Sequence, residues 1–131
     1  MSAQRLNNAR QKILVVDDDP SLRELLQVFL EQVGFEVRTA PDGQAGLDAL
    51  GESHFDIILS DFRMPGMSGS EMAAVVRQTD PVIPIILITG DAYTLESEAV
   101  ARAGITRVLP KPLKLSELLN LLWVHSPQLA A

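Results

Sequence analysis

Short apolar runs alternate along the chain with segments of helical periodicity. The runs at 13–16, 57–59 and 85–88 are apolar at consecutive positions, which is typical of parallel strands buried on both faces. Two further segments, 35–40 and 107–109, are also predicted to be strands. Together these segments predict an α/β fold in which a parallel sheet is covered by helices on both faces. The alternation does not fix the order of the strands.

Apolar residues spaced three or four positions apart predict five helices between and after these strands. Each apolar face is expected to pack against the sheet. In chain order the faces comprise Leu22, Leu25, Leu26, Phe29, Leu30 and Val33; residues within 44–50, opened by Asp42 and Gly43; Met72, Val75 and Val76; Leu95, Ala99, Val100 and Ala103; and Leu115, Leu118, Leu119 and Leu122.

Local signals mark where several of these helices begin and end. Asp19 is a predicted N-cap, and Ser68 with Glu71 has the spacing of a capping box. Gly34 and Gly104 follow the last apolar residue of their helices, as C-terminal glycines do.

Length and composition narrow the class of protein. A chain of 131 residues fits one domain, which we expect over 12–125, with flexible tails at 1–11 and 126–131. The absence of cysteine excludes a disulfide scaffold, a thiolate metal site and a cysteine nucleophile. No apolar run is long enough to span a membrane, and the N-terminus does not look like a signal peptide. We therefore expect a soluble cytoplasmic protein. Its net charge of −6 argues against direct binding to nucleic acid or an anionic membrane.

Polar side chains follow four of the predicted strands. Asp17 and Asp18 follow the first, Asp61 the third, Thr89 the fourth and Lys111 the fifth. The carboxyl ends of parallel strands meet at one edge of a sheet, where ligands bind. Carboxylates gathered there repel one another and need a cation, and a set of oxygen ligands favours Mg²⁺, with Mn²⁺ as a substitute.

This set of groups suits transfer of a phosphoryl group onto an aspartate. A carboxylate can act as the nucleophile toward phosphorus, and a metal ion, a lysine and a hydroxyl can hold the phosphoryl oxygens. The sequence offers no obvious base for ordinary hydrolysis.

Four segments of the chain resemble the receiver domain of two-component response regulators, over about 12–124. They are ILVVDDDP (13–20), DIILSDFRMPGMSG (56–69), PIILITG (84–90) and LPKPL (109–113). The resemblance implies a flavodoxin-like (βα)5 three-layer sandwich with strand order 2-1-3-4-5. It also implies a signalling module that catalyses only its own phosphorylation and dephosphorylation.

The resemblance assigns a role to each candidate residue. Asp61 is implied to be the phosphoacceptor, and Asp17 and Asp18 are implied to hold Mg²⁺ with Asp61 and the backbone carbonyl of Arg63. The implied donor is a phosphohistidine on a sensor histidine kinase or a histidine phosphotransfer protein.

The remaining implied roles concern the switch. Thr89 is the implied switch hydroxyl, and Lys111 is implied to pair with a phosphoryl oxygen, with a cis peptide bond before Pro112. Val108 stands where the family usually has Tyr or Phe, so the usual aromatic partner of the threonine is missing. Tyr93 is a candidate substitute.

The last predicted helix carries apolar residues beyond its core stripe. Leu121, Trp123 and Val124 lie off that stripe and are either partly buried or part of an interface. Family members often pair through the last strand and its flanking helices, so a homodimer through this surface is expected.

Two other functions are compatible with an α/β fold of this size. Asp17 and Asp19 superficially fit an aspartate-nucleophile, Mg²⁺-dependent phosphohydrolase, although Pro20 follows at once and a cap domain has no room. A flavin carrier is opposed by the acidic first strand–helix turn. The receiver is expected either to act alone or to have been part of a hybrid kinase or larger regulator.

Three residues beside the implied acceptor and switch are predicted to modulate the lifetime of a phosphoryl group. Arg63 and Asp91 each lie two residues beyond those positions and are expected to face each other, restricting the approach of water, while Gly90 leaves access for a donor. Arg63→Ala is therefore predicted to lose a phosphoryl group faster than the wild type. Decay of the radiolabelled protein measures this, and equal or slower loss from the variant would contradict it.

Overall fold

A five-stranded parallel sheet in the order β2-β1-β3-β4-β5 forms the centre of the molecule. The computed structural model describes residues 10–90 and 104–125. The strands are β1 (Lys12–Val16), β2 (Glu36–Ala40), β3 (Ile57–Asp61), β4 (Ile85–Thr89) and β5 (Arg107–Pro110). This order confirms the topology that the resemblance implies.

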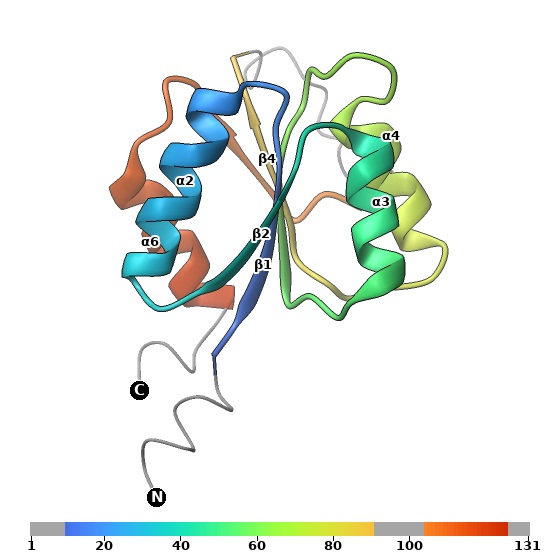
Figure 1. Cartoon of the computed structure of the whole chain (residues 1–131). Helices are drawn as coiled ribbons and strands as arrows, with labels where there is room; N and C mark the ends of the chain where they lie inside the picture. The colour runs from blue at the N-terminus through green and yellow to red at the C-terminus, as the bar shows by residue number, and fades with distance from the viewer. Residues whose placement is uncertain (1–9, 91–103, 126–131) are drawn as a thin grey trace, which may run out of the picture.

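Four helices cover the two faces of the sheet in the described part of the chain. They are α2 (Pro20–Gln32), α3 (Gly43–Glu52), α4 (Gly69–Arg77) and α6 (Leu115–His125). Helices α2 and α6 lie on one face, and α3 and α4 lie on the other (Figure 1). The helix predicted around Leu95–Ala103 falls outside the described residues. Among the residues that are described, no helix has the length and apolar character needed to cross a membrane.

Alternate residues of the strands supply two separate cores. Leu14 and Ile58 pack with residues of α3 and α4, whereas Val15 and Leu59 pack with residues of α2 and α6. All four are essentially inaccessible to solvent. Because every buried strand is apolar on both faces, only the residues at strand ends are left to carry polar chemistry.

Two residues predicted to lie on core faces do not. Leu25 is 52% exposed and Val75 is 40% exposed. Both lie at the margin of an apolar stripe whose centre is buried, as Leu26 and Val76 are. Periodicity defines the direction of a helical face but not how far the covering layer extends around it.

The predicted helix caps are confirmed. The Asp19 carboxylate accepts hydrogen bonds from the first turn of α2, and Ser68 and Glu71 form a reciprocal capping box at α4. Gly34 ends α2 with a φ of 110°. Phe35 belongs to this helix ending, because its N–H donates to the Leu30 carbonyl, so β2 begins one residue later than predicted.

A glycine supports the backbone of the strand that ends in Asp61. Gly69 begins α4, and its N–H donates to the Phe62 carbonyl at 2.8 Å. A Cβ atom at Gly69 would lie 2.5 Å from the carbonyl oxygen of Asp61 and 2.8 Å from a methyl carbon of Leu87. Only glycine therefore lets α4 start this close to the end of β3.

Gly69→Ala is predicted to destabilise the fold because the added methyl group must displace backbone next to Asp61. We expect a loss of about 1–3 kcal/mol in the free energy of unfolding, measured by urea denaturation. Gly51→Ala is the matched control, since a Cβ at Gly51 meets nothing within 4 Å and alanine favours a helix. Equal stability of the two variants would contradict this account of Gly69.

Candidate functional site

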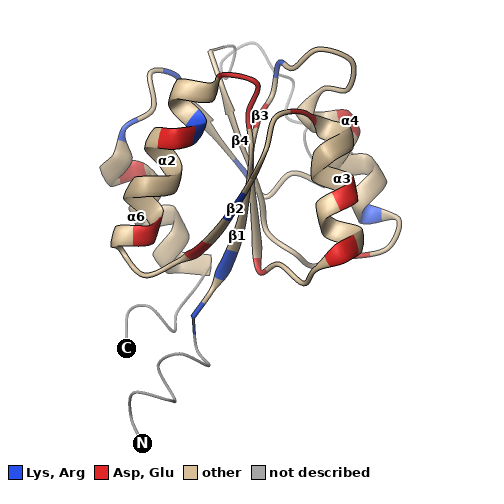
Figure 2. Cartoon of the chain, in the orientation of Figure 1, with Lys and Arg blue, Asp and Glu red and all other residues tan. Residues whose placement is uncertain are grey.

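Three carboxylates converge at the carboxyl edge of the sheet. Asp17, Asp18 and Asp61 each offer an oxygen atom, and these atoms all lie within 4.8 Å of one another. The acidic segment between β1 and α2 lies at the upper edge of the sheet in Figure 2. Parallel pairing of β1 with β3 sets Val16 opposite Ser60, so the two strands end side by side. The predicted gathering of these aspartates at one edge is what the structure shows.

Asp17 is the most deeply buried member of this cluster. It is 1% exposed, its N–H donates to the Ala40 carbonyl, and its Oδ1 accepts the Asp19 N–H at 2.8 Å. Its Oδ2 is buried and has no hydrogen-bond partner among the described residues. Such an atom is costly to leave unpaired, so it is well suited to bind a ligand.

Burial raises the pKa of Asp17 above its ordinary value. The negative charges of Asp61 and Asp18 raise this pKa further, while the hydrogen bond from Asp19 and the charge of Lys111 oppose the rise. Asp17 therefore resists ionisation in the metal-free protein. A divalent cation would reverse this, because it stabilises the carboxylate that burial and repulsion disfavour.

The donor set fits Mg²⁺ or Mn²⁺. All of its ligand atoms are carboxylate oxygens, which suit a hard cation, and one of them, Asp17 Oδ2, is buried without a hydrogen-bond partner among the described residues. Arg63 follows β3 by two residues, and its guanidinium lies 5.9 Å from the centroid of the Phe62 ring. Its backbone carbonyl stays a predicted fourth ligand.

A lysine contacts the same cluster from the end of β5, two strands away from β3 in the sheet. Lys111 follows β5, and its Nζ lies 3.2 Å from Oδ1 of Asp61. The Asp61 side chain is 6% exposed and that of Lys111 is 37% exposed, so the carboxylate is buried while the ammonium borders solvent. The Lys111 N–H donates to the Thr89 carbonyl, and the Lys111–Pro112 bond is cis, as predicted.

The other predicted switch residues lie on β4 and β5. Thr89 is the last residue of β4 and is 2% exposed. Val108 is half-buried, pairs with Leu87 and packs against the core beneath α3 and α4. Gly90 is exposed, and a Cβ there would enter open space, in keeping with the predicted access. Asp91 and Tyr93 lie outside the described residues.

Two polar contacts near the cluster were not predicted from the sequence. Arg23 donates from Nη1 to the backbone carbonyl of Asp17 at 2.7 Å, and Ser60 Oγ donates to the carbonyl of Asp61 at 2.8 Å. Arg23 lies in the first turn of α2, but the sequence gives no signal for the direction of its side chain. Ser60 offered none, because a buried hydroxyl in a strand has many possible acceptors.

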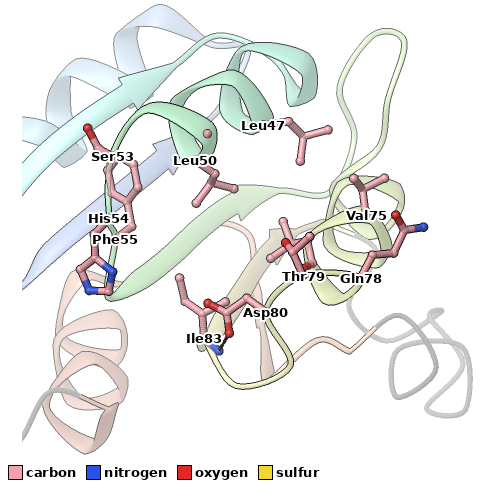
Figure 3. Close-up of a pocket in the computed structure, with 12 residues that line it drawn as sticks. Leu47, Leu50, Ser53, His54, Phe55, Val75, Gln78, Thr79, Asp80 and Ile83 are labelled. Carbon is pink, nitrogen blue, oxygen red and sulfur yellow. Dashed lines mark hydrogen bonds between the residues drawn. The ribbon is translucent and has the colours of Figure 1, made fainter.

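A separate pocket lies at the opposite edge of the sheet. It has a volume of about 470 Å³ and lies between α3 and α4 (Figure 3). Its lining includes His54 and Phe55 before β3, and Asp80 and Ile83 before β4. It therefore lies at the amino ends of these strands and has no part in the carboxylate cluster.

Comparison with known proteins identifies one family. The model of the response regulator receiver domain matches residues 13–122. The DNA-binding response regulator MtrA of Mycolicibacterium smegmatis is 37% identical over 113 residues, which cover 86% of this chain and 49% of MtrA. The sensor histidine kinase RcsC of Escherichia coli is 35% identical over 120 residues, which cover 92% of this chain and 13% of RcsC. The chain thus spans half or less of the length of these two relatives.

A solved structure shares both the fold and the sequence pattern. The response regulator TrrA of Thermotoga maritima, determined in complex with Mg²⁺–BeF, has a TM-score of 0.81 and 30% identity. The match covers 88% of this chain and 98% of that one.

Asp17→Asn is predicted to stabilise the metal-free protein, because it removes a buried charge that two neighbouring carboxylates repel. In EDTA we expect the melting temperature to rise by about 2–5 °C, since the Asn side chain can still accept the Asp19 N–H. Added MgCl₂ should raise the melting temperature of the wild type but not of the variant. A variant that melts lower than the wild type in EDTA would contradict this reading of the cluster.

Proposed function

Because the chain belongs to the response regulator receiver domain family of two-component systems, we propose that Asp61 is its phosphoacceptor. The observation that carries this proposal is the contact of Asp61 with Lys111, within a cluster that also holds Asp17 and Asp18. A buried nucleophile, a cation to hold the incoming oxygens and two further acids for a metal ion form one continuous site. A histidine kinase fits as the partner of such a receiver domain, since the sensor histidine kinase RcsC itself contains a region similar to this chain.

The geometry suggests how each residue acts in the transfer. An oxygen of Asp61 attacks phosphorus, and the bond from the donor imidazole nitrogen to phosphorus breaks, the imidazole keeping the electron pair. Bound Mg²⁺ supplies neutralisation of the phosphoryl oxygens. Lys111 exchanges its contact with the carboxylate for one with a phosphoryl oxygen, and the Thr89 hydroxyl holds another.

The donor in this proposal is a phosphohistidine on a sensor histidine kinase or a histidine phosphotransfer protein. The protein then catalyses only its own phosphorylation and dephosphorylation and acts by changing the conformation seen by a partner or output domain.

The phosphohydrolase alternative is less well supported. Asp19 would have to work as an acid or base, but its Oδ1 caps α2 by accepting the N–H groups of Ser21 and Leu22.

We also propose that β5 and α6 provide the surface for pairing with a second copy. Of the three apolar residues off the core stripe, Trp123 is 44% exposed and Val124 is 69% exposed, whereas Leu121 is partly buried against the core. Leu121 and Val124 line a groove between β5 and α6 that also carries the opposite charges of Arg107 and Glu117. An apolar patch with both charges at its border suits a self-complementary contact.

Asp61→Asn is predicted to abolish formation of an acyl phosphate, because the amide cannot act as the nucleophile. Wild-type protein incubated with acetyl phosphate and Mg²⁺ should gain the mass of one phosphoryl group, on the peptide that contains Asp61, and EDTA should prevent the gain. Asp48→Asn, the same change at an exposed carboxylate of α3, is the control and should react like the wild type. An adduct of equal yield in Asp61→Asn would contradict the proposal.

A further inference from the structure

An arginine in the first turn of α2 holds the peptide group that joins two of the clustered aspartates. Arg23 Nη1 donates to the backbone carbonyl of Asp17 at 2.7 Å. This carbonyl belongs to the peptide between Asp17 and Asp18, so its orientation affects the direction of both side chains. We propose that Arg23 is a positioning residue for the divalent cation. The inference rests on the proposed function, because it takes that cation to be bound by this cluster.

The other polar groups of Asp17 bind partners of their own, and its carbonyl oxygen accepts the hydrogen bond from Arg23. Its N–H is bound to the Ala40 carbonyl at 3.1 Å, and its Oδ1 accepts the Asp19 N–H at 2.8 Å. With the carbonyl held by Arg23, each of these groups has a partner and the buried Oδ2 is left for a ligand. The residue is thus held at three points so that one oxygen stays directed at the cluster.

The position of the Asp18 side chain depends on the orientation of this peptide more strongly than that of the Asp17 side chain does. It is exposed to solvent, so packing does little to fix its side chain. Its carboxylate nevertheless contributes an oxygen within 4.8 Å of those of Asp17 and Asp61. If the peptide before Asp18 were free to rotate, this exposed carboxylate would sample many positions. Cation binding would then have to order it, which would lower the affinity for the cation.

Arg23 is itself held in place by the start of the helix. Its N–H donates to the Asp19 carbonyl at 3.0 Å, while the Asp19 side chain caps the same turn. The side chain is half-buried, which restricts its motion. The cap of α2, Arg23 and the Asp17–Asp18 peptide therefore form one closed unit next to the acidic edge.

The charge of Arg23 and its hydrogen bond predict opposite effects on metal binding. A guanidinium beside the carboxylates repels a divalent cation, so loss of the charge alone would strengthen binding. Loss of the hydrogen bond disorders the ligands and would weaken it, as mutation of groups that orient metal ligands usually does. The sign of the change therefore separates a positioning role from a purely electrostatic one.

The test is titration of the full chain with MgCl₂ by isothermal calorimetry. Arg23→Met, which keeps an aliphatic stem for packing but loses the donor and the charge, should bind Mg²⁺ about tenfold more weakly than the wild type. Arg23→Lys, which keeps a donor and the charge, should recover much of the affinity. Arg38→Met is the matched control, because Arg38 pairs with Glu52 at the surface and its loss should leave affinity unchanged.

A second measurement does not depend on metal. In EDTA, the amide ¹⁵N resonance of Asp18 should shift in Arg23→Met and not in Arg38→Met, because the hydrogen bond polarises the peptide that contains this nitrogen. Unchanged or tighter Mg²⁺ binding by Arg23→Met would overturn the inference, as would an unmoved Asp18 resonance. Failure of the wild type to bind Mg²⁺ would instead overturn the proposed function on which the inference rests.

Discussion

The repulsion among three carboxylates at one sheet edge is the constraint on which the rest of the site depends. Parallel pairing of β1 with β3 ends both strands at the same level, so Asp17, Asp18 and Asp61 meet whether or not their charges favour it. Burial makes the conflict worse, because Asp17 and Asp61 are removed from the water that would otherwise screen them. Lys111 relieves part of it, through its contact with Asp61. The rest of the repulsion is available to drive cation binding.

Contacts from the surrounding fold hold the main chain next to these mutually repelling carboxylates. Ser60 binds the carbonyl of Asp61, Arg23 binds the carbonyl of Asp17, and Gly69 brings α4 up against the end of β3. Each of these contacts acts on the main chain and leaves the carboxylate oxygens available. The stability of the domain comes from two apolar cores on either side of the sheet, which allow the carboxylates at this edge to stay close together despite their repulsion. Addition of a phosphoryl group at Asp61, as we propose, would change the charge balance of that edge directly.

Local signals in the sequence predicted much of this structure. Asp19, Gly34 and the Ser68–Glu71 pair act within one or two helical turns, and the structure confirms each of them. The strand ends that carry Asp17, Asp61 and Lys111 were also evident, because an apolar run stops abruptly at a charge. The strand order came from the resemblance to receiver domains, since alternation of strands and helices is compatible with several orders.

The misses have physical causes. Leu25 and Val75 lie at the margins of apolar stripes, and how far a neighbouring layer covers a helix depends on tertiary packing. The contacts of Arg23 and Ser60 with main-chain carbonyls depend on side-chain directions that no spacing rule encodes. The predicted pairing of Arg63 with Asp91 and the predicted role of Tyr93 are not misses: each involves a residue outside the described part of the chain, so they stay predictions.

We propose that Asp61 accepts a phosphoryl group beside a cation that neighbouring carboxylates hold. A crystal structure of the protein grown with Mg²⁺ and beryllofluoride, a mimic of the phosphoryl group, tests this most directly. We expect one beryllofluoride on the Asp61 carboxylate, one Mg²⁺ among Asp17, Asp18, Asp61 and the Arg63 carbonyl, and Lys111 Nζ in contact with a fluorine atom. Beryllofluoride on another side chain, or Mg²⁺ bound away from these carboxylates, would contradict it.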